Sequence, residues 1–296
     1  MKYEFIKNHT QEFSIERMSK VLDVSRSGYY KFIHAALSAR SKENDALLEK
    51  IKAIYKESRG TYGSPRIHAE LRWQGATYSR KRVARLMKKA GIEAKMKKRF
   101  KRTTKINPKA KFAPNLLKQD FTAYAPNQRW VADFTYVATG EGWLYVAIVL
   151  DLFSRKVVGL AMEERMTTEL VLNALEQAIL HRQPNVGLIH HSDKGSQYTS
   201  QDFQALLTFY GFIASMSGTG NCYDNATAET FFHTLKTEHI YFECYETRAQ
   251  AKESIFEYVE VFYNRKRRHS TLGYLSPDIF EKQWYQKENF HLPTVH

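Results

Sequence analysis

Residues 129–162, RWVADFTYVATGEGWLYVAIVLDLFSRKVVGLAM, contain three apolar runs separated by short turns. The runs are rich in Val, Ile, Leu and aromatic residues, which favour β-strands. Thr139-Gly140-Glu141-Gly142 and the region of Ser154 supply the turns. Three strands joined in this way form an antiparallel meander. The stretch therefore predicts that the second half of the chain is built on a β-sheet.

The segments after this stretch predict that the sheet is mixed. Residues 167–182, TTELVLNALEQAILHR, have apolar residues at helical spacing, and residues 186–193, VGLIHHSD, read as a further strand. A helix between two strands is a crossover that returns the chain to the first sheet. A short strand at 212–217 and a long helix from about Ala226 follow. The expected fold class is α/β, with a mixed five-stranded sheet flanked by helices.

Charge separates the two halves of the chain. Residues 1–120 hold 30 Lys and Arg against 11 Asp and Glu, whereas the remainder holds 15 basic and 20 acidic residues. The net charge of +14 thus comes from the N-terminal part, which indicates a nucleic-acid-binding arm rather than an evenly basic soluble surface. The two Cys residues form no CxxC, which argues against a disulfide framework or a zinc finger. No segment approaches the roughly 18 apolar residues of a membrane span, so we expect a cytoplasmic protein without membrane contact.

These patterns divide the chain into four parts. We expect a helix-turn-helix DNA-binding region at 1–60, a second basic helical DNA-binding region with a linker at 61–117, an α/β catalytic domain at 118–285 and a C-terminal tail at 286–296.

The first region contains a helix, a tight turn and a second helix between Ser14 and Ile33. Ser25 is placed to cap the second helix, which would then be the DNA-reading helix. An ordinary helical hairpin has the same pattern, and the neighbouring basic charge favours the DNA-reading interpretation. The candidate DNA contacts on this helix are Arg26, Tyr29, Tyr30 and Lys31.

Three further basic segments are candidates for DNA contact. The helix predicted at 79–91 is apolar on one side and basic on the other, with no acidic residue, which fits a phosphate backbone better than a solvated face. The Pro-containing stretch 95–115 reads as an extended basic linker. For the cluster at 265–269, DNA contact and a solvated face are equally consistent with the sequence. The candidates are Arg80, Lys81, Arg82, Arg85, Lys88 and Lys89 on the helix, Lys97, Lys98, Arg99, Lys101 and Arg102 in the linker, and Arg267 and Arg268 in the cluster.

Two aspartates stand where apolar strands end. Asp133 lies inside the first strand and Asp193 closes the fourth, and an unpaired carboxylate in such a place is costly. If the strands are neighbours, the two acids repel unless a cation or a proton lies between them. His190 and His191 beside Asp193 are either metal or phosphate contacts or hydrogen-bonded structural groups.

A third carboxylate completes a metal-binding pattern. Glu229 follows Asp193 after 35 intervening residues and lies on the long helix that begins after Asn225, the expected N-cap. Lys236 lies about two turns further on the same face. Asp133, Asp193 and Glu229 could hold two Mg²⁺ for in-line phosphoryl transfer, with Mn²⁺ as a substitute, while Lys236 contacts a DNA phosphate. Acids at such separations also occur by chance, so strand and helix context carries the prediction.

At these residues the sequence resembles the DDE transposases of the IS3 group, whose catalytic domain is shared with retroviral integrases. The matching segments are RWVADFTYV, HHSDKGSQYTS, SMSGTGNCYDNATAETFFHTLKTE and YNRKRRHSTLGYLSPDIFE, together with VLDVSRSGYYKF and GTYGSPRIHAELR in the N-terminal part. They follow the family's order along essentially the whole chain. The Ala-Thr-Ala before Glu229 departs from the Pro expected in many members.

The resemblance implies an RNase H-like core in which Asp133, Asp193 and Glu229 bind Mg²⁺. It implies a DNA transposase that cleaves and joins insertion-sequence ends, binds terminal repeats and target DNA, and works as a homo-oligomer in the bacterial cytoplasm at the nucleoid. It also implies a second-frame product that acts with an upstream-frame protein or as a fusion to it.

Two alternatives stay open. One is a DNA-binding regulator with an inert catalytic domain, against which the intact carboxylates argue. The other is a nuclease that cuts without joining, since hydrolysis and strand transfer use the same metals with different nucleophiles.

Overall fold

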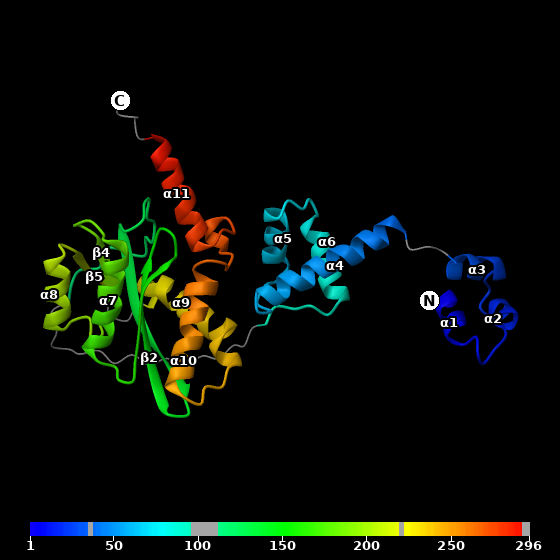
Figure 1. Cartoon of the computed structure of the whole chain (residues 1–296), viewed down its shortest axis with the longest axis horizontal. Helices are drawn as coiled ribbons and strands as arrows, with labels where there is room; N and C mark the ends of the chain where they lie inside the picture. Colours follow the sequence, from blue (N-terminus) through cyan, green and yellow to red (C-terminus); the bar gives the residue numbers. More distant parts are fainter. Residues whose placement is uncertain (35–37, 96–111, 219–221, 292–296) are drawn as a thin grey trace.

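The computed structural model describes residues 1–34, 38–95, 112–218 and 222–291. Along the long axis of the molecule, a small helical bundle at one end is followed by a second helical bundle and then by the sheet with its helices (Figure 1).

The N-terminal bundle is formed by α1 (Lys2–Asn8), α2 (Ile15–Val21) and α3 (Arg26–His34). Its small core consists of Ile6, Met18 and Tyr29, one residue from each helix. The Ser25 hydroxyl accepts a hydrogen bond from the Gly28 N–H at 3.0 Å and so caps α3. The helix, tight turn and helix expected in this segment are therefore present.

The middle bundle is formed by α4 (Ala39–Glu57), α5 (Ser64–Trp73) and α6 (Arg80–Lys89). Leu47 and Ile51 of α4 are fully buried with Leu71 of α5 and Val83 of α6. The expected boundary near residue 60 therefore differs from the structure, because the apolar face of α4 is covered by α5 and α6 rather than by the N-terminal bundle. The break between the two bundles lies between α3 and α4.

The sheet has five strands in the order β3-β2-β1-β4-β5. The strands are β1 (Arg129–Thr139), β2 (Gly142–Asp151), β3 (Val157–Glu163), β4 (Ile189–Ser192) and β5 (Ile213–Met216). Strands β1, β2 and β3 pair antiparallel, whereas β4 pairs parallel with both β1 and β5. The mixed five-stranded, RNase H-like arrangement predicted from the sequence is confirmed.

Helices cover both faces of this sheet. On one face, α7 (Thr168–Arg182) and α8 (Gln201–Phe209) pack over residues such as Trp130 and Val149. A Cβ at Gly159 would overlap the carbonyl oxygen of Ala174, so glycine lets α7 lie directly against β3. The other face carries α9 (Ala226–Glu238), α10 (Arg248–Phe256) and a π-helix, Glu257–Tyr263.

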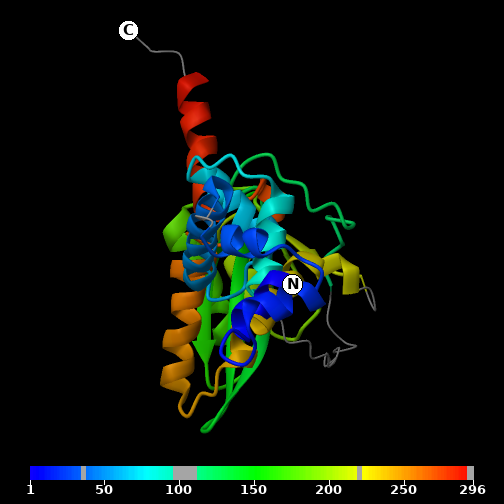
Figure 2. The same ribbon diagram turned by 90° about the vertical axis from the view of Figure 1, so that its right-hand side faces the viewer.

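Short 3-10 helices at Cys222–Asn225, Ile240–Phe242 and Ser270–Leu272 connect these parts, and α11 (Pro277–His291) projects from the sheet domain (Figures 1 and 2). Within the expected tail at 286–296, α11 continues to His291. Buried Glu281 anchors α11 by a bidentate pair with Arg182, with both distances 2.8 Å.

The middle bundle packs against the sheet domain. Its core residues belong to the same apolar cluster as Val131 of β1 and Phe231 of α9. The Arg268 N–H donates to the Tyr62 hydroxyl at 2.6 Å, and Arg59 pairs with Glu257. The middle bundle and the sheet domain therefore share one hydrophobic core. Within the part of the chain that the structure describes, no helix is long and apolar enough to cross a membrane.

Candidate active site

Asp133 lies in β1 just beyond the point where β4 stops pairing with it. Val131 is opposite His191 in the parallel register, and Asp133 is opposite Ile148 of β2. Because side chains alternate along a strand, Asp133 shares the face of Val131, which packs toward α9. The carboxylate is half-buried, and its Oδ1 accepts the Phe134 N–H at 2.8 Å.

Asp193 directly follows β4, and the same register brings it beside Asp133. Its Oδ1 accepts the Gly195 N–H at 2.8 Å, which folds the next residues back over the carboxylate. A Cβ at Gly195 would stand 2.9 Å from that oxygen, so a side chain here would push the Asp193 carboxylate out of its place. Asp193 follows the end of β4 as expected, whereas Asp133 lies within β1 rather than at its end; the register nevertheless places the two aspartates on neighbouring strands, side by side.

Glu229 lies in the first turn of α9, and its carboxylate is exposed. Phe231, Phe232 and Leu235 are buried and fix the helix against the sheet. Lys236 is half-buried on the same helix, with its Nζ 5.5 Å from the centroid of the Tyr136 ring on β1. The helix thus presents an acid and a base toward the strand that carries Asp133.

Asn225 immediately precedes α9, and its side chain makes a contact that the sequence did not predict. It occupies the N-cap position without making a side-chain capping bond. Its Nδ2 instead donates to the carbonyl oxygen of Ala132 at 3.2 Å, and both residues are buried. The N-cap position is therefore as predicted, but its side chain does not cap: Asn225 ties the start of the Glu229 helix to the residue before Asp133.

The electrostatics show that these charges act on one another. Burial, followed by the negative charge of Asp193, raises the pKa of Asp133 well above its ordinary value; Glu229 adds to this and Lys236 opposes it. Burial also raises the pKa of Asp193 and lowers the pKa of Lys236. Two crowded carboxylates of this kind favour a cation or a proton between them.

The residues present fit a divalent cation in their chemistry. Asp and Glu carboxylates are the oxygen ligands that Mg²⁺ prefers, and the pKa of Asp133 is raised first by burial and then by the negative charge of Asp193. Among the described residues, however, no group of three or more His, Cys, Asp or Glu side chains is placed closely enough to hold a metal ion. Glu229 would have to approach the two aspartates for all three to act as ligands.

Tyr198 was not among the sequence candidates. It is buried, and its hydroxyl has no hydrogen-bond partner among the described residues. Burial raises its pKa well above the ordinary value, and the charges of Asp133 and Asp193 raise it further, so a protonated phenol stands beside the pair. A tyrosine shortly after a strand-end aspartate is a weak sequence signal, because only the turn at Gly195 brings it back.

The two histidines before Asp193 are buried, neutral groups. The His191 ring bonds to Ser215 Oγ at 2.8 Å and Ser217 Oγ at 3.3 Å. Burial lowers the pKa of His190 to about 3 and that of His191 to about 4. Of the two interpretations, the structure supports the hydrogen-bonded one for His191.

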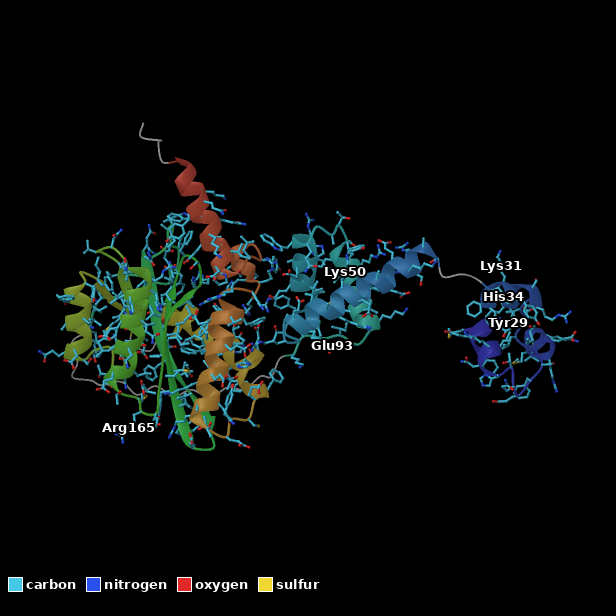
Figure 3. The ribbon with its side chains drawn as sticks, viewed as in Figure 1. Tyr29, Lys31, His34, Lys50, Glu93 and Arg165 are labelled. Atoms are coloured by element: carbon cyan, nitrogen blue, oxygen red, sulfur yellow. The ribbon has the colours of Figure 1, made fainter. Side chains whose placement is uncertain are left out.

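The recognition-helix candidates on α3 fall into two groups. Arg26, Tyr30 and Lys31 are exposed, whereas Tyr29 is 4% exposed and packs in the bundle core. In Figure 3, Lys31 lies on the outer side of α3 and Tyr29 on the side of α1 and α2. The prediction that Tyr29 contacts DNA is corrected, because the bundle needs this ring as its core.

Helix α6 presents most of its basic residues to solvent. Arg82 is the exception: its Nη2 pairs with Glu43 Oε2 at 2.9 Å, and its Nε donates to Asn44 Oδ1. This guanidinium joins α6 to α4, so its DNA contact is also corrected. The exposed candidates are Arg80, Lys81, Arg85, Lys88 and Lys89. The linker candidates Lys97, Lys98, Arg99, Lys101 and Arg102 lie outside the described residues.

Arg267 and Arg268 are internal ion-pair partners, and their assignment as DNA contacts is corrected. Each is 4% exposed. Arg267 makes two bonds of 2.7 Å to Glu238, and Arg268 donates to Glu70 at 2.6 Å. Their partners come from α9 and α5, so the basic cluster joins the sheet domain to the middle bundle.

Comparison with protein families defines the class. The family described as Integrase core domain matches residues 123–222, and a second family of the same description matches residues 229–284. An HTH-like domain family matches residues 42–100, which include α5, α6 and most of α4. The chain therefore combines a helix-turn-helix-like domain with an integrase core.

Relatives of known sequence identify the family. A 31 kDa protein of insertion element IS600 from Shigella sonnei is 46% identical over 269 residues, covering 91% of this chain and 99% of its own length. Transposase InsF of insertion sequence IS3A from Escherichia coli K12 is 42% identical over 285 residues, covering 96% and 99%. The chain belongs to the IS3 family of insertion-sequence transposases, and it is an enzyme of the polynucleotidyl transferase class.

Among solved structures, the HTLV-2 integrase catalytic core domain in complex with magnesium has a TM-score of 0.41 and 17% identity. The match covers 54% of this chain and 99% of that one.

Proposed function

We propose that this transposase binds the ends of an insertion sequence and cuts and joins DNA strands at the site formed by Asp133, Asp193 and Glu229. The observation that carries the proposal is the apposition of Asp133 and Asp193 across β1 and β4, with Glu229 and Lys236 facing them from α9. The crowding of these carboxylates does little to stabilise the fold, because burial and mutual repulsion both raise the free energy of their charged forms.

Asp133, Asp193 and Glu229 are the proposed ligands of two Mg²⁺, with Mn²⁺ as a substitute. Two such metal ions, when bound, would activate the attacking oxygen and stabilise the leaving oxygen of an in-line displacement. The chain's own residues place the ligands. The backbone N–H groups of Gly195 and Phe134 orient the carboxylates of Asp193 and Asp133. The Asn225 side chain holds the start of α9 against β1. Lys236 is the proposed contact to a DNA phosphate near the reacting strand.

DNA binding is assigned to exposed residues of α6 and α3, all of them basic except Tyr30. The proposed contacts on α6 are Arg80, Lys81, Arg85, Lys88 and Lys89, and those on α3 are Arg26, Tyr30 and Lys31. Lys97, Lys98, Arg99, Lys101 and Arg102 stay predictions from the sequence, as does the upstream-frame partner. Two DNA ends must be handled together, which supports a homo-oligomer on DNA. The bacterial relatives support a cytoplasmic place of action.

A strand-transfer assay tests this proposal. Purified protein is incubated with Mg²⁺ and end-labelled DNA carrying the element's own terminal repeats, beside Glu229→Gln and Glu169→Gln. Glu169 is the matched control, because it is an exposed glutamate in the first turn of α7, over the other face of the sheet. Joined products that disappear only in Glu229→Gln support the assignment. Equal joining by both variants would remove Glu229 from the site.

Cut but unjoined DNA from the unaltered protein would favour a nuclease. Binding without cutting would favour a regulator or a chain that needs its upstream partner.

A further inference from the structure

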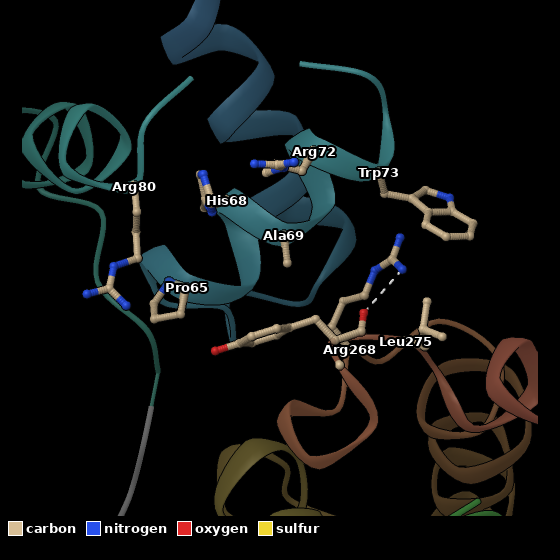
Figure 4. A pocket seen from close by; sticks show the side chains of 10 residues that line it. Pro65, His68, Ala69, Arg72, Trp73, Arg80, Arg268 and Leu275 are labelled. Atoms are coloured by element: carbon tan, nitrogen blue, oxygen red, sulfur yellow. Dashed lines mark hydrogen bonds between the residues drawn. The ribbon is translucent and has the colours of Figure 1, made fainter. Parts of the chain in front are cut away.

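A basic cavity lies between the middle bundle and the sheet domain, away from the carboxylate site. Its volume is about 520 Å³, within the range of about 300–1,000 Å³ that is usual for ligand sites. Figure 4 shows His68 and Arg72 on α5 and Arg80 at the start of α6, with Arg268 and Leu275 approaching from the sheet domain. The cavity is therefore lined by three guanidinium groups, from α5, from α6 and from the loop after the π-helix.

The charges of this cavity are only partly compensated. Arg268 is paired with Glu70, and its Nη1 donates to the Tyr274 carbonyl at 3.3 Å. Arg72 and Arg80 are exposed, and neither forms an ion pair within 4.0 Å in the described part of the chain. The cavity thus offers two guanidinium groups to an anion, and guanidinium groups bind phosphate oxygens through paired N–H donors.

An aromatic wall stands beside these cations. The Trp73 indole is 52% exposed although it lines the cavity. The Arg268 guanidinium carbon lies 4.9 Å from the centroid of this ring and holds it in place. A held, exposed indole next to free guanidinium groups is suited to stack a nucleic-acid base while its phosphate is bound.

We infer that this cavity binds an unstacked nucleotide of the DNA strand, with its base on Trp73 and its phosphate on Arg72 and Arg80. The inference rests on the proposed DNA function and adds a site to it. Arg80 belongs both to the cavity and to α6, so a strand held by α6 passes the cavity on its way to the sheet domain. The site would hold one DNA strand at the junction of the middle bundle and the sheet domain.

Photo-cross-linking locates the bound base directly. A short single-stranded oligonucleotide containing 5-iodouracil is mixed with the full chain without Mg²⁺, irradiated, and the attached peptide is identified by mass spectrometry. Attachment at Trp73 is expected. Attachment confined to α3, α6 or the segment after residue 95 would overturn the inference.

Affinity measurements test the two chemical parts of the site. Trp73→Leu should bind a labelled oligothymidylate about tenfold more weakly, the loss that one base-stacking contact supports. Arg72→Gln should weaken binding and lower the slope of log affinity against log salt by about 0.7, the share of one phosphate contact on a single strand. Lys287→Gln on α11 is the matched control for a lost exposed charge and should bind as the unaltered protein does.

An abasic oligonucleotide separates stacking from general charge attraction. The unaltered protein should bind it about as weakly as Trp73→Leu binds oligothymidylate, and Trp73→Leu should lose little more. Equal affinity of the unaltered protein for both oligonucleotides would overturn the nucleotide site. If Trp73→Leu fails to fold, as judged by thermal unfolding, Arg72→Gln and the abasic comparison still decide.

These measurements are independent of strand transfer, because binding is read without metal. Failure of the catalytic proposal therefore leaves their outcome interpretable.

Discussion

Arg66 on α5 forms an ion pair with Glu238 at the end of α9, with Nη1 3.1 Å from Oε1. Glu238 is also held by Arg267 through two bonds of 2.7 Å and accepts the Tyr258 hydroxyl at 3.1 Å. The helix that carries Glu229 and Lys236 is thereby attached to the middle bundle, which matches the HTH-like domain family. This contact joins the proposed DNA-binding part to the proposed active site.

We expect Glu238→Gln to destabilise the protein by about 3–5 kcal/mol, because it leaves the buried guanidinium of Arg267 without its counter-ion. Urea unfolding followed by circular dichroism measures the change. Glu49→Gln removes an exposed pair with Lys52 and should cost less than about 1 kcal/mol. Similar losses of unfolding free energy in the two variants would show that the buried pair stabilises the protein no more than the exposed one.

The same pair predicts a pH dependence. Burial alone would raise the pKa of Glu238, but the hydrogen bonds and charge of Arg267, with Arg66, lower it below its ordinary value of 4.5. A carboxylate with a lowered folded-state pKa adds stability above its unfolded pKa and loses it as pH falls through the folded one. Acid unfolding below about pH 4.5 should therefore be less steep in Glu238→Gln.

Asp133→Asn should raise the stability of the metal-free protein by about 1–2 kcal/mol at neutral pH. The pKa of Asp133 is raised, so its charged form opposes folding as pH rises, and asparagine keeps an acceptor for the Phe134 N–H. Mg²⁺ should raise the thermal midpoint of the unaltered protein and of Asp202→Asn, an exposed aspartate in α8, but not of Asp133→Asn. An equal rise in all three proteins would place the metal elsewhere.

Tyr198→Phe separates stability from function at the same site. Removing a buried hydroxyl that lacks a partner among the described residues should leave the free energy of unfolding equal or raise it by about 1–2 kcal/mol. Strand transfer should slow, because the substitution removes a polar group close enough to the aspartate pair for both carboxylates to raise its pKa. A clear loss of stability would show that the hydroxyl has a structural partner.

Two neighbouring residues of α6 should behave differently. Lys81→Gln should weaken duplex binding and reduce the salt slope by about 1, as expected for one phosphate contact. Arg82→Gln should mainly lower stability, since Arg82 is bonded to Glu43 and Asn44. Filter binding at several salt concentrations and thermal unfolding distinguish them, and the reverse pattern would exchange their roles.

The sequence predicted those features that are local in the chain. Strand and helix periodicity located β1, β2, β3, α7 and α9, and the capping serine located α3. The meeting of Asp133 and Asp193 was predictable because both follow apolar strand segments that a crossover brings together. Even so, the position of Tyr198 beside the two aspartates depends on a turn at Gly195, which the spacing of apolar residues in the sequence does not reveal.

Long-range partners explain the predictions that failed. Arg268 pairs with Glu70, which precedes it by 198 residues, and Arg267 pairs with Glu238, 29 residues earlier. A run of basic residues has the same sequence pattern whether it faces DNA or acids of another element. Tyr29 failed for a related reason, because three short helices need an aromatic ring in their core.

The central claim is that the aspartate pair and Glu229 form one site for DNA strand transfer. Its most direct test is joining of pre-cut insertion-sequence ends to a target by Asp193→Asn, beside Asp202→Asn, with Mg²⁺ and with Mn²⁺. We predict no joining by Asp193→Asn with either ion, undiminished binding of the ends, and normal joining by Asp202→Asn. Joining by Asp193→Asn at the rate of the control would contradict the account.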